Sequence, residues 1–208
     1  MMYGRVLDAD LNIFHKPARL LICGNSGSGK SSLVVALLQK YRNNFDLVVV
    51  IGADLEGVES LDIKRDDDFN PLLDAVKGEK TLVIFDDCIF NQKQMKVASE
   101  SFVRARHLGV SLIFLSQNLY LQDRNYRVIG LNVTHVFLLK QRDLKQIILY
   151  AKSFLEDNLV QKFVDVYKKI VLKIKYNYIL IDFTKDYDSP LLIRSNLTGE
   201  TYEKAYQL

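Results

Sequence analysis

Two features of the sequence predict an α/β fold, with a mostly parallel sheet flanked by helices. Short apolar runs recur along the chain, and none alternates cleanly between apolar and polar residues, which is typical of strands covered on both faces. These runs span residues 20–23, 47–51, 82–85, 110–115 and 133–139. Helical segments lie between several of them, and this alternation favours parallel strands joined by helical crossovers.

Helices are predicted from residue spacing and from capping residues. Residues 31–42 carry apolar side chains at helical spacing, and 92–106 form a further helical segment. Between them, Asn70 and Pro71 suit an N-cap and a first helical position, and Gly78 suits a stop, so we expect a helix over 70–78. A later stripe at i, i+3, i+4 and i+7 is expected to face the core: Val160, Phe163, Val164 and Tyr167.

The C-terminal part of the chain predicts a short β-hairpin. Its two strands are expected over 175–183 and 191–194, around a turn at 188–190. The sequence shows no internal repeat, low-complexity tract or linker, so we expect a single domain over 1–208.

The composition excludes several classes of protein. An apolar share of 49% with 25% charged residues is ordinary for a globular domain. The sequence contains no run of 18 apolar residues, so it predicts no membrane-spanning helix. The N-terminus also lacks the apolar core of a signal peptide. We therefore expect an intracellular protein without membrane contact. Cys23 and Cys88 are expected to be reduced core thiols, and no histidine or cysteine cluster has zinc spacing.

A phosphate-binding loop follows the first predicted strand. The stretch GNSGSGKS fits the pattern G-x-x-x-x-G-K-[ST] at every position, between a strand and a helix as that motif requires. Its backbone N–H groups would surround phosphate oxygens, Lys30 would reach the β- and γ-phosphates, and Ser31 would ligate Mg²⁺. The candidate nucleotide-binding residues are Gly24, Asn25, Ser26, Gly27, Ser28, Gly29, Lys30, Ser31 and Ser32.

Two carboxylates end the third predicted strand, in TLVIFDD. Ligands of open α/β sheets bind at the carboxyl ends of the strands. Asp86 is therefore a candidate Mg²⁺ ligand beside Ser31, and Asp87 a candidate base that orients or deprotonates the attacking water.

The stretch RARHLGVSLIFLSQN places polar residues at both ends of the fourth predicted strand. Gln117, at its exit, could bind the γ-phosphate or the water, or could be an ordinary polar loop residue. Arg104 and Arg106, at its entrance, could act on the nucleotide of a neighbouring subunit, as arginine fingers do. The alternative is that both are surface cations at the end of a helix.

The net charge of +3 does not by itself predict a nucleic-acid partner, but the charges are unevenly distributed. Residues 54–79 carry nine acids against three bases, most simply a solvated loop. Residues 140–175 carry nine lysines and arginines against four acids. The latter block could face the phosphates of DNA or could be a solvated helix surface.

Taken together, these motifs resemble the FtsK/HerA superfamily of ring ATPases, and most of all its viral branch, the genome-packaging ATPases of poxviruses, other large DNA viruses and virus-like transposons. The matching stretches are GNSGSGKSS, TLVIFDD, RARHLGVSLIFLSQN, YRVIGLN and VFLLK. Arg127 and Asn132 fit a further arginine and asparagine of the family pattern, with looser spacing. The resemblance covers roughly residues 18–195.

The resemblance implies a RecA-like P-loop NTPase sheet with strand order 5-1-4-3-2. It implies ATP and Mg²⁺ as cofactors, a ring of five or six copies, double-stranded DNA bound without sequence preference, and capsid or portal vertex proteins as partners. The site of action would be the host cytoplasm or nucleus during virus assembly, and Arg127 would be a further candidate arginine finger. Cellular members usually have Glu where this chain has Asp87, whereas Asp is common in the viral branch.

Three other readings remain open at this point. A small P-loop kinase for a nucleoside or nucleotide would explain the P-loop but neither the Asp86–Asp87 pair nor Gln117. A helicase or conjugation ATPase that moves DNA in another setting would share the same site. A nucleotide-gated binding module without catalysis is disfavoured because every phosphate-handling position is filled.

Overall fold

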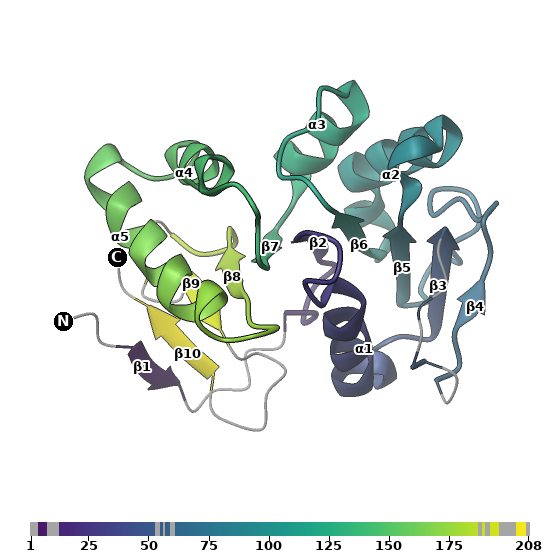
Figure 1. Ribbon diagram of the computed structural model, residues 1–208. Coiled ribbons are helices and arrows are strands. Elements are labelled where there is room, and N and C mark those ends of the chain that lie inside the picture. Colours follow the sequence, from purple (N-terminus) through teal and green to yellow (C-terminus); the bar gives the residue numbers. More distant parts are fainter. Residues whose placement is uncertain are drawn as a thin grey trace.

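One continuous β-sheet organises the computed structural model, which describes residues 4–7, 13–52, 55, 57–58, 61–186, 189, 192–195 and 203–206. Over these residues the sheet has ten strands in the order β1-β10-β9-β8-β7-β2-β6-β5-β3-β4 (Figure 1). The strands are β1 Gly4–Leu7, β2 Arg19–Cys23, β3 Leu47–Gly52, β4 Lys64–Arg65, β5 Thr81–Asp86, β6 Ser111–Ser116, β7 His135–Leu138, β8 Ile179–Asp182, β9 Ile193–Ser195 and β10 Glu203–Tyr206.

The central strands confirm the order predicted from the sequence. The five predicted apolar runs correspond to strands β2, β3, β5, β6 and β7. These strands lie in the order β7-β2-β6-β5-β3, and every neighbouring pair is parallel. The sheet is wider than predicted, because β4 adds a parallel strand at one edge and β8, β9, β10 and β1 an antiparallel extension at the other. The predicted C-terminal hairpin is β8 with β9, and β8 pairs directly with β7.

Helices cover both faces of the sheet and give three layers (Figure 1). On one face α1 packs against alternate residues of the central strands, and on the other face α2, α3, α4 and α5 pack against the remaining ones. The stripe predicted to face the core does so, since Val160, Phe163, Val164 and Tyr167 of α5 are all buried. The helices are α1 Lys30–Tyr41, α2 Gln92–Arg104, α3 Arg124–Asn132, α4 Leu144–Lys152 and α5 Asp157–Tyr167, with short 3₁₀ helices Arg42–Asn44, Cys88–Phe90 and Ala105–Leu108 and a π-helical turn Lys168–Leu172.

The helix predicted over 70–78 is wrong. Asn70 begins one helical turn, because its carbonyl accepts the N–H groups of Leu73 and Asp74. The carboxylate of Asp74 then accepts the N–H of Asn70, and the chain continues as turns. Leu72 and Ala75 pack against the core, but Leu73 is 79% exposed and Val76 54% exposed, so this short segment buries too little apolar surface to sustain a helix.

Two further details of the sequence-based prediction are settled by the fold. The helix predicted over 92–106 ends at Arg104, and the chain continues into the 3₁₀ helix Ala105–Leu108. Neither Cys23 nor Cys88 forms a disulfide, and both are buried, as predicted for core thiols. The turn predicted at 188–190 lies largely outside the described residues.

A buried ionic cluster joins β7, β8 and β9. The Asp182 carboxylate accepts hydrogen bonds from Arg194 Nη2 at 2.6 Å and Thr184 Oγ1 at 2.6 Å, and His135 Nε2 lies 3.3 Å away. Burial alone would raise the pKa of Asp182, but the hydrogen bonds from His135 and Thr184 and the charge of Arg194 outweigh it and hold that pKa well below its usual range. The Asp182 carboxylate therefore stays ionised inside the protein, beside the Arg194 guanidinium.

We expect Asp182→Asn to lower the free energy of unfolding by about 3–5 kcal/mol, because it removes the carboxylate that is ion-paired with the buried Arg194 guanidinium. Urea denaturation measures the change. Asp68→Asn is the matched control, since Asp68 pairs with Lys93 on the surface and its loss should change stability little. Equal, small effects of both substitutions would contradict a structural role for the cluster.

Candidate nucleotide-binding site

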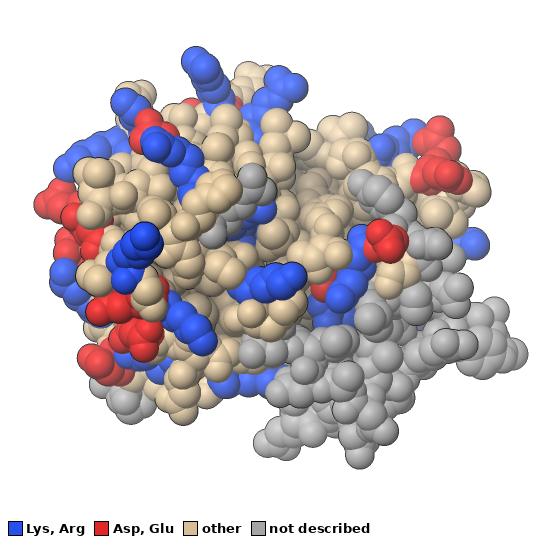
Figure 2. All heavy atoms as spheres, turned by 180° about the vertical axis from the view of Figure 1, so that it is seen from behind, with Lys and Arg blue, Asp and Glu red and all other residues tan. Residues whose placement is uncertain are grey.

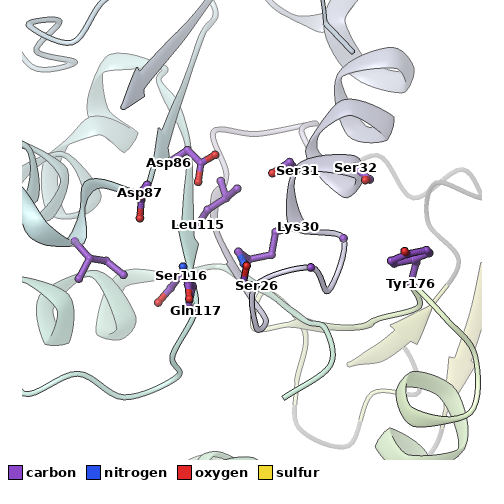
Figure 3. A pocket seen from close by; sticks show the side chains of 13 residues that line it. Ser26, Lys30, Ser31, Ser32, Asp86, Asp87, Leu115, Ser116, Gln117 and Tyr176 are labelled. Carbon is purple, nitrogen blue, oxygen red and sulfur yellow. The ribbon is translucent and has the colours of Figure 1, made fainter. Parts of the chain in front are cut away.

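A cleft of about 380 Å³ lies at the carboxyl edge of the parallel strands. Residues from four separate parts of the chain meet there: the P-loop with the start of α1, the end of β5, the end of β6, and the loop before β8. The lining residues are Ser26, Gly27, Gly29, Lys30, Ser31, Ser32, Asp86, Asp87, Ile89, Leu115, Ser116, Gln117 and Tyr176 (Figure 3).

The P-loop is anchored between the ends of β6 and β7. Gly24 N–H donates to the carbonyl of Ser116 at 3.1 Å, and Asn25 N–H donates to the carbonyl of Lys140 at 3.0 Å. A β-carbon on Gly24 would lie 2.4 Å from Ser28 Oγ and 2.7 Å from Leu139 Cβ, so this turn requires glycine. Gly24, Asn25 and Ser28 thus form the base of the loop, while the other predicted P-loop residues line the cleft.

The N-terminus of α1 opens into the cleft. Gly29 is its N-cap, with φ 96°, and has no side chain to satisfy the first N–H groups of the helix. No acidic residue stands in the first turn of α1. These N–H groups and the helix dipole together suit an anion, which is the ligand that the motif predicts.

Lys30 extends along the P-loop, where its Nζ donates to the carbonyls of Gly24 at 2.8 Å and Asn25 at 3.2 Å. Burial lowers the pKa of Lys30, and the nearby carboxylates of Asp86 and Asp87 oppose that shift. The side chain therefore places a partly desolvated amine between the loop and the two acids.

The two acids follow β5 and differ in exposure. Asp86 is half-buried, and burial together with the charge of Asp87 raises the pKa of its carboxyl group, which Lys30 partly offsets. Asp87 is exposed and has φ 52° in the left-handed region, which a non-glycine residue adopts at a cost of order 1–3 kcal/mol. Such strain is found preferentially at functional positions, where the surrounding fold holds it.

These residues suit a magnesium ion bound together with a nucleotide. Asp86 and Ser31 line the same cleft and offer the hard oxygen ligands that Mg²⁺ prefers. Among the described residues, no three His, Cys, Asp or Glu side chains come together as a metal cluster. A Mg²⁺ ion here would accordingly complete its coordination with phosphate oxygens and water.

Gln117 reaches the cleft as the sequence predicts. It directly follows β6, which lies between β2 and β5, and its exposed side chain lines the cleft beside Ser116 (Figure 3). The next residue, Asn118, accepts a hydrogen bond at its carbonyl from the hydroxyl of Tyr126 on α3. The turn that carries Gln117 is therefore tied to the first turn of α3.

The three candidate arginines are placed differently. Arg104 ends α2 with an exposed side chain, close to the amino ends of the strands, where Arg19 of β2 donates to the carbonyl of Phe102. Arg127 is exposed on α3, next to Tyr126 and thus near the carboxyl edge. Neither lines the cleft of its own chain. The backbone of Arg106 lies in the 3₁₀ helix Ala105–Leu108, and its side chain lies outside the described part of the chain.

Sequence reasoning missed four residues of the cleft: Ile89, Leu115, Ser116 and Tyr176. Leu115 and Ser116 directly precede Gln117 at the end of β6. Ile89 is two residues beyond Asp87, so its proximity to the site could have been anticipated. Tyr176 comes from the loop before β8, and no motif surrounds it. Only the antiparallel pairing of β8 with β7, beside the P-loop strand, brings that loop to the cleft.

Comparison with solved structures identifies the fold. The genome packaging NTPase B204 from Sulfolobus turreted icosahedral virus 2, solved with sulfate, matches with a TM-score of 0.58 and 16% identity over 81% of this chain and 92% of that chain. The DNA-packaging ATPase B204 from Sulfolobus turreted icosahedral virus matches with a TM-score of 0.56 and 15% identity over 81% and 94%. This chain has the fold of P-loop ATPases.

The cytoplasmic domain of the type VII secretion ATPase EccC from Thermomonospora curvata shares the fold as well, with a TM-score of 0.54 and 16% identity over 99% of this chain and 28% of that chain. The predicted resemblance to viral packaging ATPases is thereby confirmed at the level of the fold. No protein-family model and no curated protein matches the sequence. Over its described residues, the structure has no helix of the length and apolar character that a membrane crossing needs.

Proposed function

We propose that this chain is a Mg²⁺-dependent ATPase that drives double-stranded DNA into a viral capsid as part of a ring of five or six copies. The observation that carries the proposal is the meeting, in one cleft, of the P-loop, the Asp86–Asp87 pair and Gln117 from three different strands. A kinase would need the P-loop and one metal-binding acid, but it would need neither a second acid nor Gln117 to handle an attacking water. Their presence on a fold shared with the DNA-packaging ATPase B204 supports the packaging reading over other P-loop activities.

Each residue has a role in the proposed reaction. The P-loop N–H groups and Lys30 hold the β- and γ-phosphates. Ser31 and Asp86 would hold a Mg²⁺ ion, which would supply positive charge to the phosphate oxygens. Asp87 orients or deprotonates the attacking water, and Gln117 contacts the γ-phosphate or that water. Hydrolysis then breaks the bond between the γ-phosphorus and its bridging oxygen, and the loss of the γ-phosphate is transmitted from Gln117 through Asn118 and Tyr126 to α3.

The surface charge is consistent with sequence-independent contact to DNA phosphates. All nine lysines and arginines of 140–175 are exposed. On the face seen in Figure 2, however, basic side chains are dispersed among acidic and uncharged ones and do not merge into a single patch. We therefore propose that DNA binds in a channel to which several subunits contribute. Portal or capsid proteins would lie at the exit of this channel. The protein would act during virus assembly in the host cytoplasm or nucleus.

The expected result is Mg²⁺-dependent ATP hydrolysis that long duplex DNA stimulates equally for unrelated sequences. DNA binding should fall steeply as salt rises, because it would rest on phosphate contacts and counterion release. The experiment measures phosphate release with and without DNA over a range of salt, with Lys30→Ala as the inactive control and native mass spectrometry for the ring. The proposal would be contradicted by any of three results. The first is ATP hydrolysis whose rate does not change with DNA, and the second is tight, salt-insensitive binding to one short sequence. The third is phosphoryl transfer to a nucleoside acceptor.

A further inference from the structure

Tyr176 occupies the end of the cleft that the proposed hydrolysis does not use. In Figure 3, Asp86, Asp87 and Gln117 lie on one side of Lys30, whereas Ser32 and Tyr176 lie on the other. The γ-phosphate belongs on the side of the two acids, where the metal ion and the attacking water would be. A nucleotide held by the P-loop therefore directs its ribose and base toward Ser32 and Tyr176.

The tyrosine ring is held directly against the P-loop. A β-carbon placed on Gly29 would lie 3.2 Å from Cδ1 of Tyr176 and 3.6 Å from its Cβ. The side chain is nevertheless 62% exposed, and Lys175 Nζ lies 4.8 Å from the ring centroid. A large aromatic surface thus stands open beside the phosphate site rather than in the core.

The backbone at Tyr176 is strained. Among the described non-glycine residues, only Asp87 at φ 52° and Tyr176 at φ 60° have positive φ, and both line the cleft. For a bulky residue this conformation costs of the order of 1–3 kcal/mol, so the surrounding fold must hold it in place. The left-handed backbone at Tyr176 accompanies the placement of its side chain against Gly29 of the P-loop. A glycine or asparagine would adopt the same backbone more readily.

We propose that Tyr176 is the stacking platform for the base of the bound nucleotide, an inference that rests on the proposed nucleotide binding. Base–aromatic stacking needs only a π face and therefore accepts every base. Near Tyr176, the described lining offers Gly29 and Ser32 and no side-chain amide or carboxylate that would read a base edge. The site should consequently bind adenine and guanine nucleotides with similar affinity.

Calorimetric titrations with Mg–ATP, Mg–GTP and inorganic tripolyphosphate test this assignment. Tyr176→Ala should weaken both nucleotides about five- to 150-fold and leave tripolyphosphate unchanged. Tyr176→Phe keeps the ring and should bind like the wild type. Tyr176→Asn suits the left-handed backbone but has no π face, so it should reproduce the alanine result even if the alanine variant folds poorly. Ile174→Ala is the matched control, an exposed apolar residue of the same loop that does not line the cleft.

Four outcomes would overturn the inference. Equal losses of ATP and tripolyphosphate would mean that Tyr176 shapes the P-loop and does not hold a base. Tighter binding of ATP by Tyr176→Ala would mean that the ring obstructs the cleft. If the wild-type protein binds tripolyphosphate but neither nucleotide, the base platform is absent while the phosphate site stands. If the wild-type protein binds neither nucleotide nor tripolyphosphate, the proposed nucleotide function is wrong, and this inference is wrong as well.

Discussion

Replacing Asp87 with asparagine should lower kcat for ATP hydrolysis by about 100-fold or more, while the Kd for Mg–ATP stays close to that of the wild type. Asp87 is exposed in the cleft, so its carboxylate is accessible to a water molecule at the γ-phosphate. Asparagine has nearly the same size and tolerates the φ of 52° at this position, so the substitution removes the charge and keeps the loop. Asp86→Asn should differ by weakening Mg²⁺-dependent nucleotide binding itself, since the half-buried Asp86 is the candidate metal ligand.

Separate measurements of single-turnover hydrolysis and nucleotide binding distinguish these roles. Asp165→Asn on α5 is a matched control, because it makes the same chemical change outside the lining of the cleft. Wild-type hydrolysis by Asp87→Asn would place the catalytic base elsewhere. Identical losses of binding in the Asp86 and Asp87 variants would show that both carboxylates act on the metal ion, with no division of roles between them.

The sequence was sufficient to predict the central sheet and the placement of most of the cleft. Five short apolar runs without alternation mark buried parallel strands, and the order of their neighbours followed from the resemblance. Because the carboxyl ends of parallel strands meet at one edge, the P-loop, Asp86, Asp87 and Gln117 had to come together once that order held. The chemical roles of these residues remain predictions for the experiments above.

The remaining features depend on contacts that local patterns do not encode. The 70–78 segment has good capping residues, but Leu73 and Val76 are exposed while Leu72 and Ala75 pack against the core, and this small buried surface does not maintain so short a helix. The short helices α3 and α4 were missed, although Asp123 and Asp143 cap them visibly. Tyr176 reaches the P-loop only because an antiparallel extension of the sheet follows β7. A tyrosine in a sequence does not indicate a left-handed backbone, so the positive φ of Tyr176 could not be predicted.

Mutating the arginine that completes a neighbouring subunit's site should lower hydrolysis about a thousandfold or more, which is the usual effect of losing an arginine finger. The sequence favours Arg106, with Arg104 beside it and Arg127 as the other candidate. Arg104 and Arg127 are exposed at opposite edges of the sheet, and neither lines the cleft of its own chain, so either would have to act across an interface. Arg127 would in addition be coupled to its own nucleotide, since Tyr126 beside it is bonded to the turn that carries Gln117.

Subunit mixing tests this action in trans. Each arginine-to-alanine protein should be inactive or nearly so in isolation if its arginine is the finger, and Lys30→Ala should be inactive because the γ-phosphate loses its main cation. In mixed rings, some interfaces pair an intact P-loop with an intact arginine, and partial activity should return for the true finger alone. Arg124→Ala, one helical turn before Arg127 and equally exposed, is the control that should stay active unmixed. If native mass spectrometry shows mixed rings and activity returns for none of Arg104, Arg106 and Arg127, these arginines do not act across the interface, and the Arg-x-Arg-His segment is then a helix end or a DNA contact.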